Sequence, residues 1–133
     1  INIVGQAKII SKLYSMLGNG SNILMMSSIS AQRGSFDPIY ASSKAAILGF
    51  IKSMADKLPK GSRINAIAPG LIDGSSMFEE MTTERQDFHK KKIHSGKLLS
   101  KLDLANVIYD LCQDHWTHLN GACIDLNGGQ NVR

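Results

Sequence analysis

Long apolar runs, cysteines and a secretory leader are scarce or missing in this chain of 133 residues. No run approaches the ~18 to 20 apolar residues that cross a bilayer, so we expect no membrane partner. No charged-then-apolar leader with a small-residue cleavage site opens the chain, and we therefore expect a cytoplasmic protein. The two cysteines, Cys112 and Cys123, lack CxxC spacing and a secretory context, which predicts buried, reduced thiols.

Aromatic residues interleaved with basic ones, the pattern of a nucleic-acid interface, are also missing. The net charge of +4 comes partly from Lys90, Lys91 and Lys92, which stand beside His89 and His94. A cluster this short is typical of a solvated helix face, so we expect no nucleic-acid partner. A composition of 43% hydrophobic and 20% charged residues is ordinary for a globular protein with a buried core.

Apolar residues recur at three- and four-residue spacings in three stretches, which predicts amphipathic helices over residues 3–17, 40–58 and 100–113. The last of these opens with a capping box at Ser100. Residues 75–93 are less apolar than the rest. They predict two short helices in a mobile flap.

Short continuous apolar runs separate the helices and predict three strands, over residues 23–26, 63–68 and 122–126. A loop is expected between the first strand and the second helix, up to Pro38. Strands that alternate with helices indicate a layered α/β fold with a parallel sheet whose strands are covered on both faces. Ligand sites are expected beyond the carboxyl ends of such strands. The residues at those ends are Ser28, Pro69 and Asn127.

Tyr40 and Lys44 are four residues apart at the start of a predicted helix, so both side chains lie on one face, one turn from each other. A free phenol has a pKa near ~10, and a neighbouring ammonium favours the phenolate form. The pair therefore has the makings of a general acid and base. By itself a YxxxK pair is weak evidence, because surface helices carry such pairs for solubility or by chance.

Further motifs accompany this pair in a fixed order. They are Ser27-Ser28, Tyr40-Ala41-Ser42-Ser43-Lys44, Arg63-Ile64-Asn65-Ala66-Ile67-Ala68-Pro69-Gly70, and Asn120-Gly121 with Asn127-Gly128-Gly129. Each motif is loose, but at these spacings they are highly specific together, and the chain resembles the classical short-chain dehydrogenases/reductases from one end to the other. The resemblance implies an α/β fold that is the C-terminal half of a doubly wound, parallel-sheet Rossmann fold, with three strands and flanking helices.

The resemblance also implies catalytic roles for four residues. Tyr40 would donate a proton to a carbonyl oxygen during reduction and remove it during alcohol oxidation, while Lys44 would favour its phenolate and hydrogen-bond the nicotinamide ribose. Ser28 would hydrogen-bond the substrate oxygen, like one donor of an oxyanion site. The backbone carbonyl of Asn2 would help hold a water in a proton relay to the lysine.

NAD or NADP is the cofactor that the resemblance implies, held through Tyr40, Lys44, Pro69, Gly70 and Ile72. Pro69 and Gly70 would border the nicotinamide, and the backbone of Ile72 would face its carboxamide. The hydride itself belongs to the cofactor. The acidic or basic residue that selects between the two cofactors is not found in the chain.

Two departures from the family pattern bear on these roles. Ser28 lies 12 residues before Tyr40, one fewer than the usual interval, whereas Ser27 lies 13 away. The position of Ser28 relative to the end of the predicted strand favours it as the catalytic serine. A loop shortened by one residue explains the interval but leaves Ser27 possible. At the position of a threonine that often follows the Pro-Gly pair stands Gly74, with Ser75 next, which would weaken or shift one cofactor hydrogen bond.

A glycine-rich turn after a strand, the phosphate-binding fingerprint, is lacking, since Gly18-Asn19-Gly20 follows a helix. The chain also starts at Ile1 with helical periodicity almost at once. We therefore expect that residues 1–133 form a single partial domain, the catalytic half, and that the N-terminal cofactor-binding half is absent.

These observations predict an NAD(P)-dependent oxidoreductase of a small-molecule carbonyl or alcohol substrate, inactive without its missing half. By resemblance, the helices over residues 3–17 and 40–58 would form the interface of a homodimer or homotetramer. The alternative is a non-catalytic truncated fragment or pseudoenzyme that cannot bind the cofactor alone. Cys112, His115 and His118 lack a fourth ligand, so no metal site is expected.

Overall fold

A three-stranded parallel sheet forms the centre of the protein, in a computed structural model that describes residues 2–132. Its strands, in the spatial order β1-β2-β3, are β1 (Asn22–Met26), β2 (Arg63–Pro69) and β3 (Cys123–Leu126). Met25 pairs with Ala66, and Ala66 pairs with Cys123 on its other side. The predicted α/β class and parallel sheet are confirmed.

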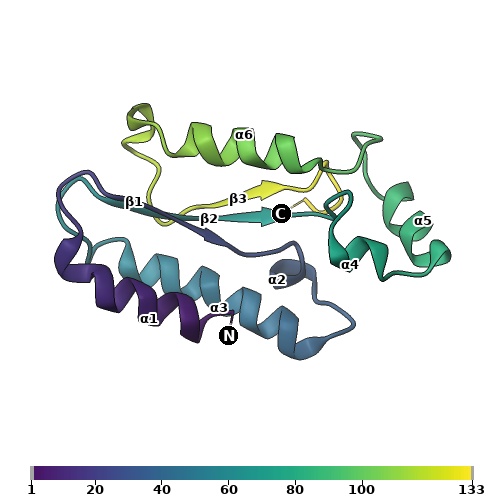
Figure 1. Cartoon of the computed structure of the whole chain (residues 1–133), viewed down its shortest axis with the longest axis horizontal. Coiled ribbons are helices and arrows are strands. Elements are labelled where there is room, and N and C mark those ends of the chain that lie inside the picture. The colour runs from purple at the N-terminus through teal and green to yellow at the C-terminus, as the bar shows by residue number, and fades with distance from the viewer. Residues whose placement is uncertain (1, 133) are drawn as a thin grey trace.

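Helices cover both faces of this sheet (Figure 1). On one face lie α1 (Val4–Leu13), which continues as the short helix η1 (Tyr14–Met16), and α3 (Pro38–Met54). On the other lies α6 (Lys101–Leu111), followed by η2 (Asp114–Trp116).

The two helices α4 (Ser76–Glu79) and α5 (Thr83–Lys91) stand beyond the carboxyl ends of the strands (Figure 1). The two short helices expected in residues 75–93 are therefore present. Each opens with a hydroxyl cap: Ser75 Oγ accepts from Phe78 N, and Thr82 Oγ1 from Arg85 N. We call residues 75–93 the flap.

Three expectations from the sequence are corrected. The segment expected to be a loop contains a short helix, α2 (Ser30–Arg33), which ends at a glycine in the left-handed region, Gly34 with φ 84°. The helix expected over residues 40–58 begins two residues earlier, at Pro38, because Asp37 caps it. Cys112, expected to be buried, is exposed at the end of α6.

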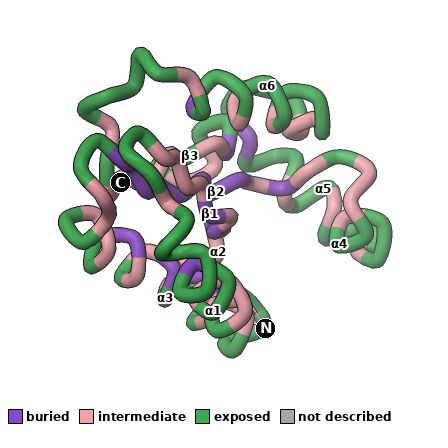
Figure 2. The backbone as a smooth tube through the Cα atoms, turned by 60° about the vertical axis from the view of Figure 1, so that its left-hand side comes forward, coloured by how far each residue is buried: buried purple, intermediate pink, exposed green. Residues whose placement is uncertain are grey.

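The hydrophobic core lies between α3 and the sheet, where the side chains of Ile47, Ile51 and Ile64 are fully buried. All seven residues of β2 are buried, whereas Met25 alone is buried in β1. In Figure 2, β2 is coloured as buried, whereas α4 and α5 in the flap are coloured as exposed or intermediate. The residues of β1 are less deeply buried than those of β2, because within residues 2–132 β1 has a sheet neighbour on one side only.

Several residues of the motifs that carry the family resemblance hold the fold together. Asn65, buried in the middle of β2, donates to Leu119 O at 2.7 Å and accepts from Ala122 N at 3.0 Å. Asn120 accepts from Ile64 N at 2.9 Å, which positions the loop before β3. Because an unpaired buried amide is costly, these contacts explain the motif residues as structural ones.

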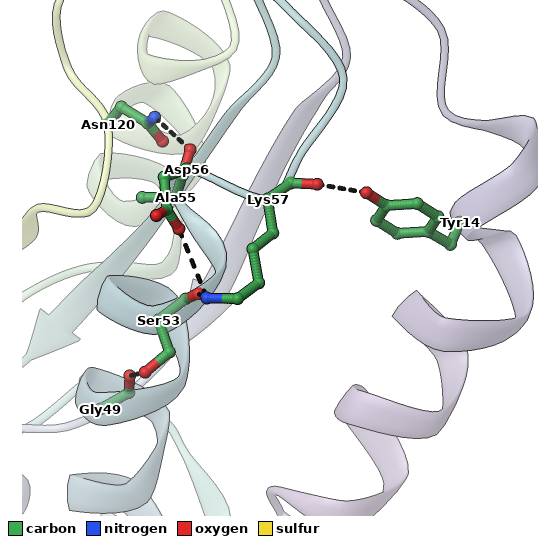
Figure 3. Close-up of polar contacts among 7 residues, drawn as sticks. All are labelled: Tyr14, Gly49, Ser53, Ala55, Asp56, Lys57 and Asn120. Atoms are coloured by element: carbon green, nitrogen blue, oxygen red, sulfur yellow. Dashed lines mark hydrogen bonds and ion pairs between the residues drawn. The ribbon is translucent and has the colours of Figure 1, made fainter.

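The carboxyl end of α3 is fastened to two other segments (Figure 3). Asn120 Nδ2 donates to Ala55 O at 2.9 Å, and the Tyr14 hydroxyl donates to Lys57 O. These contacts satisfy carbonyls that the helix leaves free at its end. They anchor α3, whose opposite end carries Tyr40.

Among residues 2–132, no helix is both long enough and apolar enough to cross a membrane.

Candidate active site

A cavity of about 710 Å³ opens beyond the carboxyl ends of the strands, between α2, the start of α3 and the flap. Ser28, Tyr40 and Gly70 all line it, together with flap residues such as Met77 and His89. This is the edge of the sheet where a ligand site was expected. The structure therefore brings the predicted serine and tyrosine to one opening, although they come from different elements.

The start of α3 determines where Tyr40 lies. Asp37 Oδ1 accepts hydrogen bonds from Ile39 N at 2.9 Å and Tyr40 N at 3.0 Å, and Pro38 occupies the first turn. A proline and an acidic cap at these positions start a helix sharply. Tyr40 consequently sits in the first turn, half-buried, with its ring at the cavity.

Lys44 lies one turn further along α3 and is buried beneath the tyrosine. Its ammonium Nζ is 5.7 Å from the centre of the Tyr40 ring and donates to Met26 O, at the end of β1, at 2.9 Å. Burial lowers the pKa of Lys44. An ammonium has three protons to donate, and one of them is used by Met26, so the group remains able to bind a further hydroxyl or water.

The two serines after β1 differ in what their hydroxyls do. Ser27 is 2% exposed, and its hydroxyl donates to Lys44 O within α3 at 2.9 Å. Ser28 lines the cavity with Tyr40, and its hydroxyl accepts from Ser30 N at 3.1 Å. Since Ser27 faces the helix and Ser28 the opening, the geometry favours Ser28 as the serine that could meet a ligand.

Asn2 lies just before α1 and contacts the helix that carries the tyrosine. Its side-chain Nδ2 donates to Ser43 Oγ at 3.2 Å, and Ser43 Oγ donates to Tyr40 O at 2.8 Å. The sequence-based hypothesis concerned the backbone carbonyl of Asn2. The structure adds a side-chain contact that ties the start of α1 to the first turn of α3.

The predicted cofactor-binding residues at and after the end of β2 are not all at the cavity. Gly70 lines it, whereas Pro69 is buried and accepts from Ile29 N at 3.0 Å. Ile72 forms a bridge with Leu99, and its carbonyl accepts from the Ser75 hydroxyl at 2.8 Å. The hydroxyl of Ser75, the residue after Gly74, is thus occupied within the chain.

Gly70 stands where a side chain would not fit. A Cβ there would lie 3.1 Å from Asn127 Cα and 3.3 Å from Gln130 Oε1. That Gln130 oxygen is buried, and no donor among the described residues bonds it. A buried acceptor of this kind needs a partner, which a ligand at Gly70 could provide.

Sequence reasoning missed four basic residues that line the same cavity: Arg33, Arg85, His89 and Lys92. We had interpreted the lysine and histidine cluster as a solvated helix face. Lys90 and Lys91 are indeed exposed, but His89 is half-buried at the cavity wall. The signal was available, because Arg85, His89 and Lys92 recur at helical spacing and must share one face of α5.

The ring of His89 is half-buried and lies beside neighbouring groups that donate protons. Its Nδ1 faces Arg33 Nη2 at 3.5 Å and Gln130 Nε2 at 3.3 Å, and both of these groups donate protons. Burial lowers the pKa of His89, and the charges of Arg33, Arg85 and Lys92 lower it further. The cavity wall around this ring is therefore electropositive.

Among residues 2–132, no group of three or more His, Cys, Asp or Glu side chains could hold a metal ion. His115 instead lies 3.5 Å from the carboxylate of Asp110, to which Trp116 also donates at 3.2 Å. These polar side chains therefore belong to the turn after α6.

The comparisons with known proteins agree with one another. Residues 1–131 match the model of a family described as Enoyl-(Acyl carrier protein) reductase. An uncharacterized short-chain type dehydrogenase/reductase from Sinorhizobium fredii is 37% identical over 117 residues, which is 85% of this chain and 46% of that protein. Dehydrogenase/reductase SDR family member 4 from Mus musculus is 32% identical over 140 residues, covering all of this chain and 50% of that protein.

The fold has solved counterparts of the same kind. A crystal structure of a short-chain dehydrogenase/reductase, glucose/ribitol dehydrogenase, from Brucella melitensis superposes with a TM-score of 0.87 at 25% identity, over 100% of this chain and 53% of that one. The chain thus spans about half the length of the relatives it matches. On its sequence and its fold together, it belongs to the short-chain dehydrogenase/reductase family.

Proposed function

We propose that this chain is the catalytic and substrate-binding half of an NAD(P)-dependent oxidoreductase that interconverts a carbonyl compound and its alcohol. One observation carries the proposal: Ser28 and Tyr40 line a single cavity, and the ammonium of Lys44 lies 5.7 Å from the Tyr40 ring. The pair gives an acid and base next to a hydroxyl that can bind the substrate oxygen. Family membership supports the reaction class.

The proton chemistry falls to residues of this chain. During reduction the C=O double bond becomes a C–O single bond, and the Tyr40 hydroxyl gives its proton to the oxygen as a hydride reaches the carbon. The ammonium of Lys44 stabilises the phenolate that remains, and Ser28 holds the same oxygen by a hydrogen bond. Oxidation of the alcohol runs the same transfers backwards, with Tyr40 as the base.

A nicotinamide cofactor, either NAD or NADP, supplies the hydride when bound. The residues present fit the nicotinamide end of such a molecule. Lys44 can donate further protons to a ribose hydroxyl, Gly70 lines the cavity without a side chain, and the unpaired Gln130 oxygen can accept from a carboxamide. Pro69 and the backbone of Ile72 would border the same end of the cofactor.

We further propose that residues 1–133 are one partial domain and that a second, N-terminal half completes it. The outer edge of β1 supports this, because within residues 2–132 that strand hydrogen-bonds to β2 alone. An unpaired strand edge is a natural site for another strand of a sheet. If no such half exists, the non-catalytic fragment is the remaining interpretation.

A homodimer or homotetramer through α1 and α3 is proposed as well. One outer face of α1 and η1 leaves Ile9 58%, Leu13 44% and Met16 77% exposed. Apolar side chains gathered on one exposed helix face favour a protein partner. Sedimentation of the full-length protein, with Ile9→Lys as the variant, tests this: the substitution should yield monomers, and an unchanged monomeric mass in both would contradict the proposal.

The function is tested by Tyr40→Phe in the full-length protein, meaning this chain joined to its cofactor-binding half. We expect kcat to fall by about 100-fold or more, because general acid catalysis typically contributes that much. Tyr109→Phe is the matched control, since Tyr109 is 72% exposed on α6. Turnover by Tyr40→Phe at the level of the Tyr109→Phe control would contradict the assignment.

Cofactor titration of the 133-residue chain separates the alternatives. We expect no tight binding of NAD or NADP by this piece, because most phosphate contacts would come from the other half. Tight binding by the isolated chain would contradict the partial-domain proposal.

A further inference from the structure

The cavity lined by Ser28 and Tyr40 has more basic than acidic residues in its wall. Arg33 from α2 and Arg85, His89 and Lys92 from α5 line it. The single carboxylate in the lining is that of Asp37, and it already accepts two backbone N–H groups at the start of α3. Against this one carboxylate stand the three cations Arg33, Arg85 and Lys92, so the lining carries a net positive charge.

These cations also lack carboxylate partners elsewhere in the described part of the chain. The ion pairs there join Lys57 to Asp56, Lys90 to Asp87 and His115 to Asp110, and none involves a basic residue of the cavity.

The basic groups of the cavity pack instead on aromatic rings. Arg85 lies 4.6 Å from the Phe36 ring centre and Lys92 lies 4.1 Å from that of Phe88. Such contacts orient a cation but do not cancel its charge. Their charge therefore remains available to a ligand.

His89 reports the field that results. Burial comes first and the charges of Arg33, Arg85 and Lys92 second in lowering its pKa. The geometry is consistent with this direction, because Arg33 Nη2 lies 3.5 Å from His89 Nδ1 and the basic groups converge on this part of the wall.

The rest of the lining is apolar. Ile29, Leu71, Met77 and Met81 contribute to the same cavity, and the two methionines come from the flap. Methionine adapts its shape to irregular apolar groups. A ligand that fills this space would therefore combine an apolar segment with a negative charge.

We propose that the substrate is an anionic carbonyl compound, in which an apolar segment joins the reacting carbonyl to a carboxylate or a phosphate. The carbonyl would lie at Ser28 and Tyr40, the apolar segment along Met77 and Met81, and the anionic group among the basic residues of α2 and α5. This inference rests on the proposed function. It adds a substrate class that Tyr40, Lys44 and Ser28 alone do not select.

Binding tests the anion site without any hydride transfer. Hexanoate, hexyl phosphate and the neutral 1-hexanol are titrated into the full-length protein by calorimetry, at low and high salt. We expect both anions to bind at least about 10-fold more tightly than hexanol, an advantage that salt weakens. Whichever anion binds more tightly identifies a carboxylate or a phosphate as the natural group.

Variants locate that binding. Arg33→Gln and Arg85→Gln should each weaken hexanoate or hexyl phosphate about 10-fold, and Arg85→Lys should recover part of the loss because it keeps the charge. Lys60→Gln is the control, since it removes the same charge from an exposed residue outside the cavity. Equal losses in Lys60→Gln and Arg85→Gln, or equal binding of hexanol and the anions, would overturn the proposal.

Turnover measurements then distinguish a failure of the anionic-substrate proposal from a failure of the proposed oxidoreductase function. With 5-oxohexanoate and the neutral 2-hexanone as substrates, Arg85→Gln should raise KM about 10-fold for the keto acid alone and leave kcat unchanged. Reduction of both ketones with equal kcat/KM would overturn the anionic substrate while leaving the oxidoreductase standing. Arg85-dependent binding of hexanoate with no reduction of either ketone would instead contradict the proposed function.

Discussion

The sheet with α3 and the flap differ in nearly every physical respect. In the first, β2 is buried along its whole length and Ile47, Ile51 and Ile64 are fully enclosed. In the second, neither α4 nor α5 contains a buried residue. The comparison teaches that stability resides in the sheet and its helix, while the flap supplies the chemical character of the cavity.

The amino-acid composition of the flap explains this difference. The sequence of α5, TERQDFHKK, has a single large apolar residue, Phe88, which is 51% exposed. Such a helix gains little from burial and depends on its cap and on contacts with neighbours. A segment held this loosely can change its side chains at small cost to the fold, which suits a region that selects the substrate.

Ile47→Ala should produce the largest effect on stability. The side chain is fully buried between α3 and the sheet, and truncation of a buried isoleucine typically costs about 2 to 5 kcal/mol. Urea unfolding of the full-length protein measures the loss. Ile39→Ala, at an 81% exposed position of the same helix, should change it by less than about 0.5 kcal/mol. Equal losses of unfolding free energy in Ile47→Ala and Ile39→Ala would contradict the view that stability resides in the packing of α3 on the sheet.

Gly128→Ala should loosen the flap without disrupting the sheet. Gly128 has φ 60°, and a Cβ there would lie 2.5 Å from Ser95 Oγ and 2.8 Å from Ile93 Cγ2, at the end of the flap. The left-handed backbone and the clash should cost about 2 kcal/mol. Hydrogen exchange should become faster in residues 83–96 and stay unchanged in β2. Gly18→Ala, with open space around it, is the control.

Ser27→Ala and Ser28→Ala should differ in their effect on catalysis. Removing the Ser27 hydroxyl breaks its buried hydrogen bond to Lys44 O and should lower the free energy of unfolding by about 1 kcal/mol. Removing the Ser28 hydroxyl loses its contact with Ser30 N and should also cost stability, by about 1 kcal/mol or less, but unlike Ser27→Ala it should lower kcat by about 100-fold. The opposite pattern would make Ser27 the residue that meets the substrate.

Stability and anion affinity should both depend modestly on pH, through His89 in the flap. Because the pKa of His89 lies below its ordinary value, the folded protein binds this proton less readily than the unfolded one. Stability from this source is present above pH ~6.5 and is lost as pH falls toward the lowered pKa. A bound anion favours the protonated ring. The affinity for an anionic probe, here hexyl sulfate, should therefore rise a few-fold as pH falls over the same interval.

His89→Gln should abolish that rise, since Arg33, Arg85 and Lys92, the charged groups that face the ring, keep their charge throughout the interval. Calorimetry at a series of pH values measures it. A rise of equal size in His89→Gln would show that another group is responsible.

Much of the fold follows from periodicity. The second predicted strand ends one residue short of Pro69, where β2 ends, and both flap helices were predicted. The helix α2 was missed because four residues, Ser30–Arg33, are too few to show a period. The shallower burial of β1 was not predicted, since an apolar run does not reveal that a strand lies at the edge of a sheet.

In the candidate site, too, local features were predictable from the sequence and long-range ones were not. Tyr40 and Lys44 were found because their spacing is local and lies within one helix. Ser28 was favoured over Ser27, but the reason visible in the structure is the hydrogen bond of Ser27 to Lys44 O. Arg33 and Gln130 gave no local signal, because their place at the cavity depends on contacts with α5.

By itself the sequence determined the order of the strands and of the longer helices, the capped start of α6 at Ser100 and the pairing of a tyrosine with a lysine one turn away. Those features depend on neighbours along the chain, whose geometry is set by backbone periodicity and capping. Tertiary structure alone decided which serine faces the opening and which basic side chains converge on it. Such convergence joins residues as far apart as Arg33 and Gln130, and their distance in space is set by packing that no local pattern encodes.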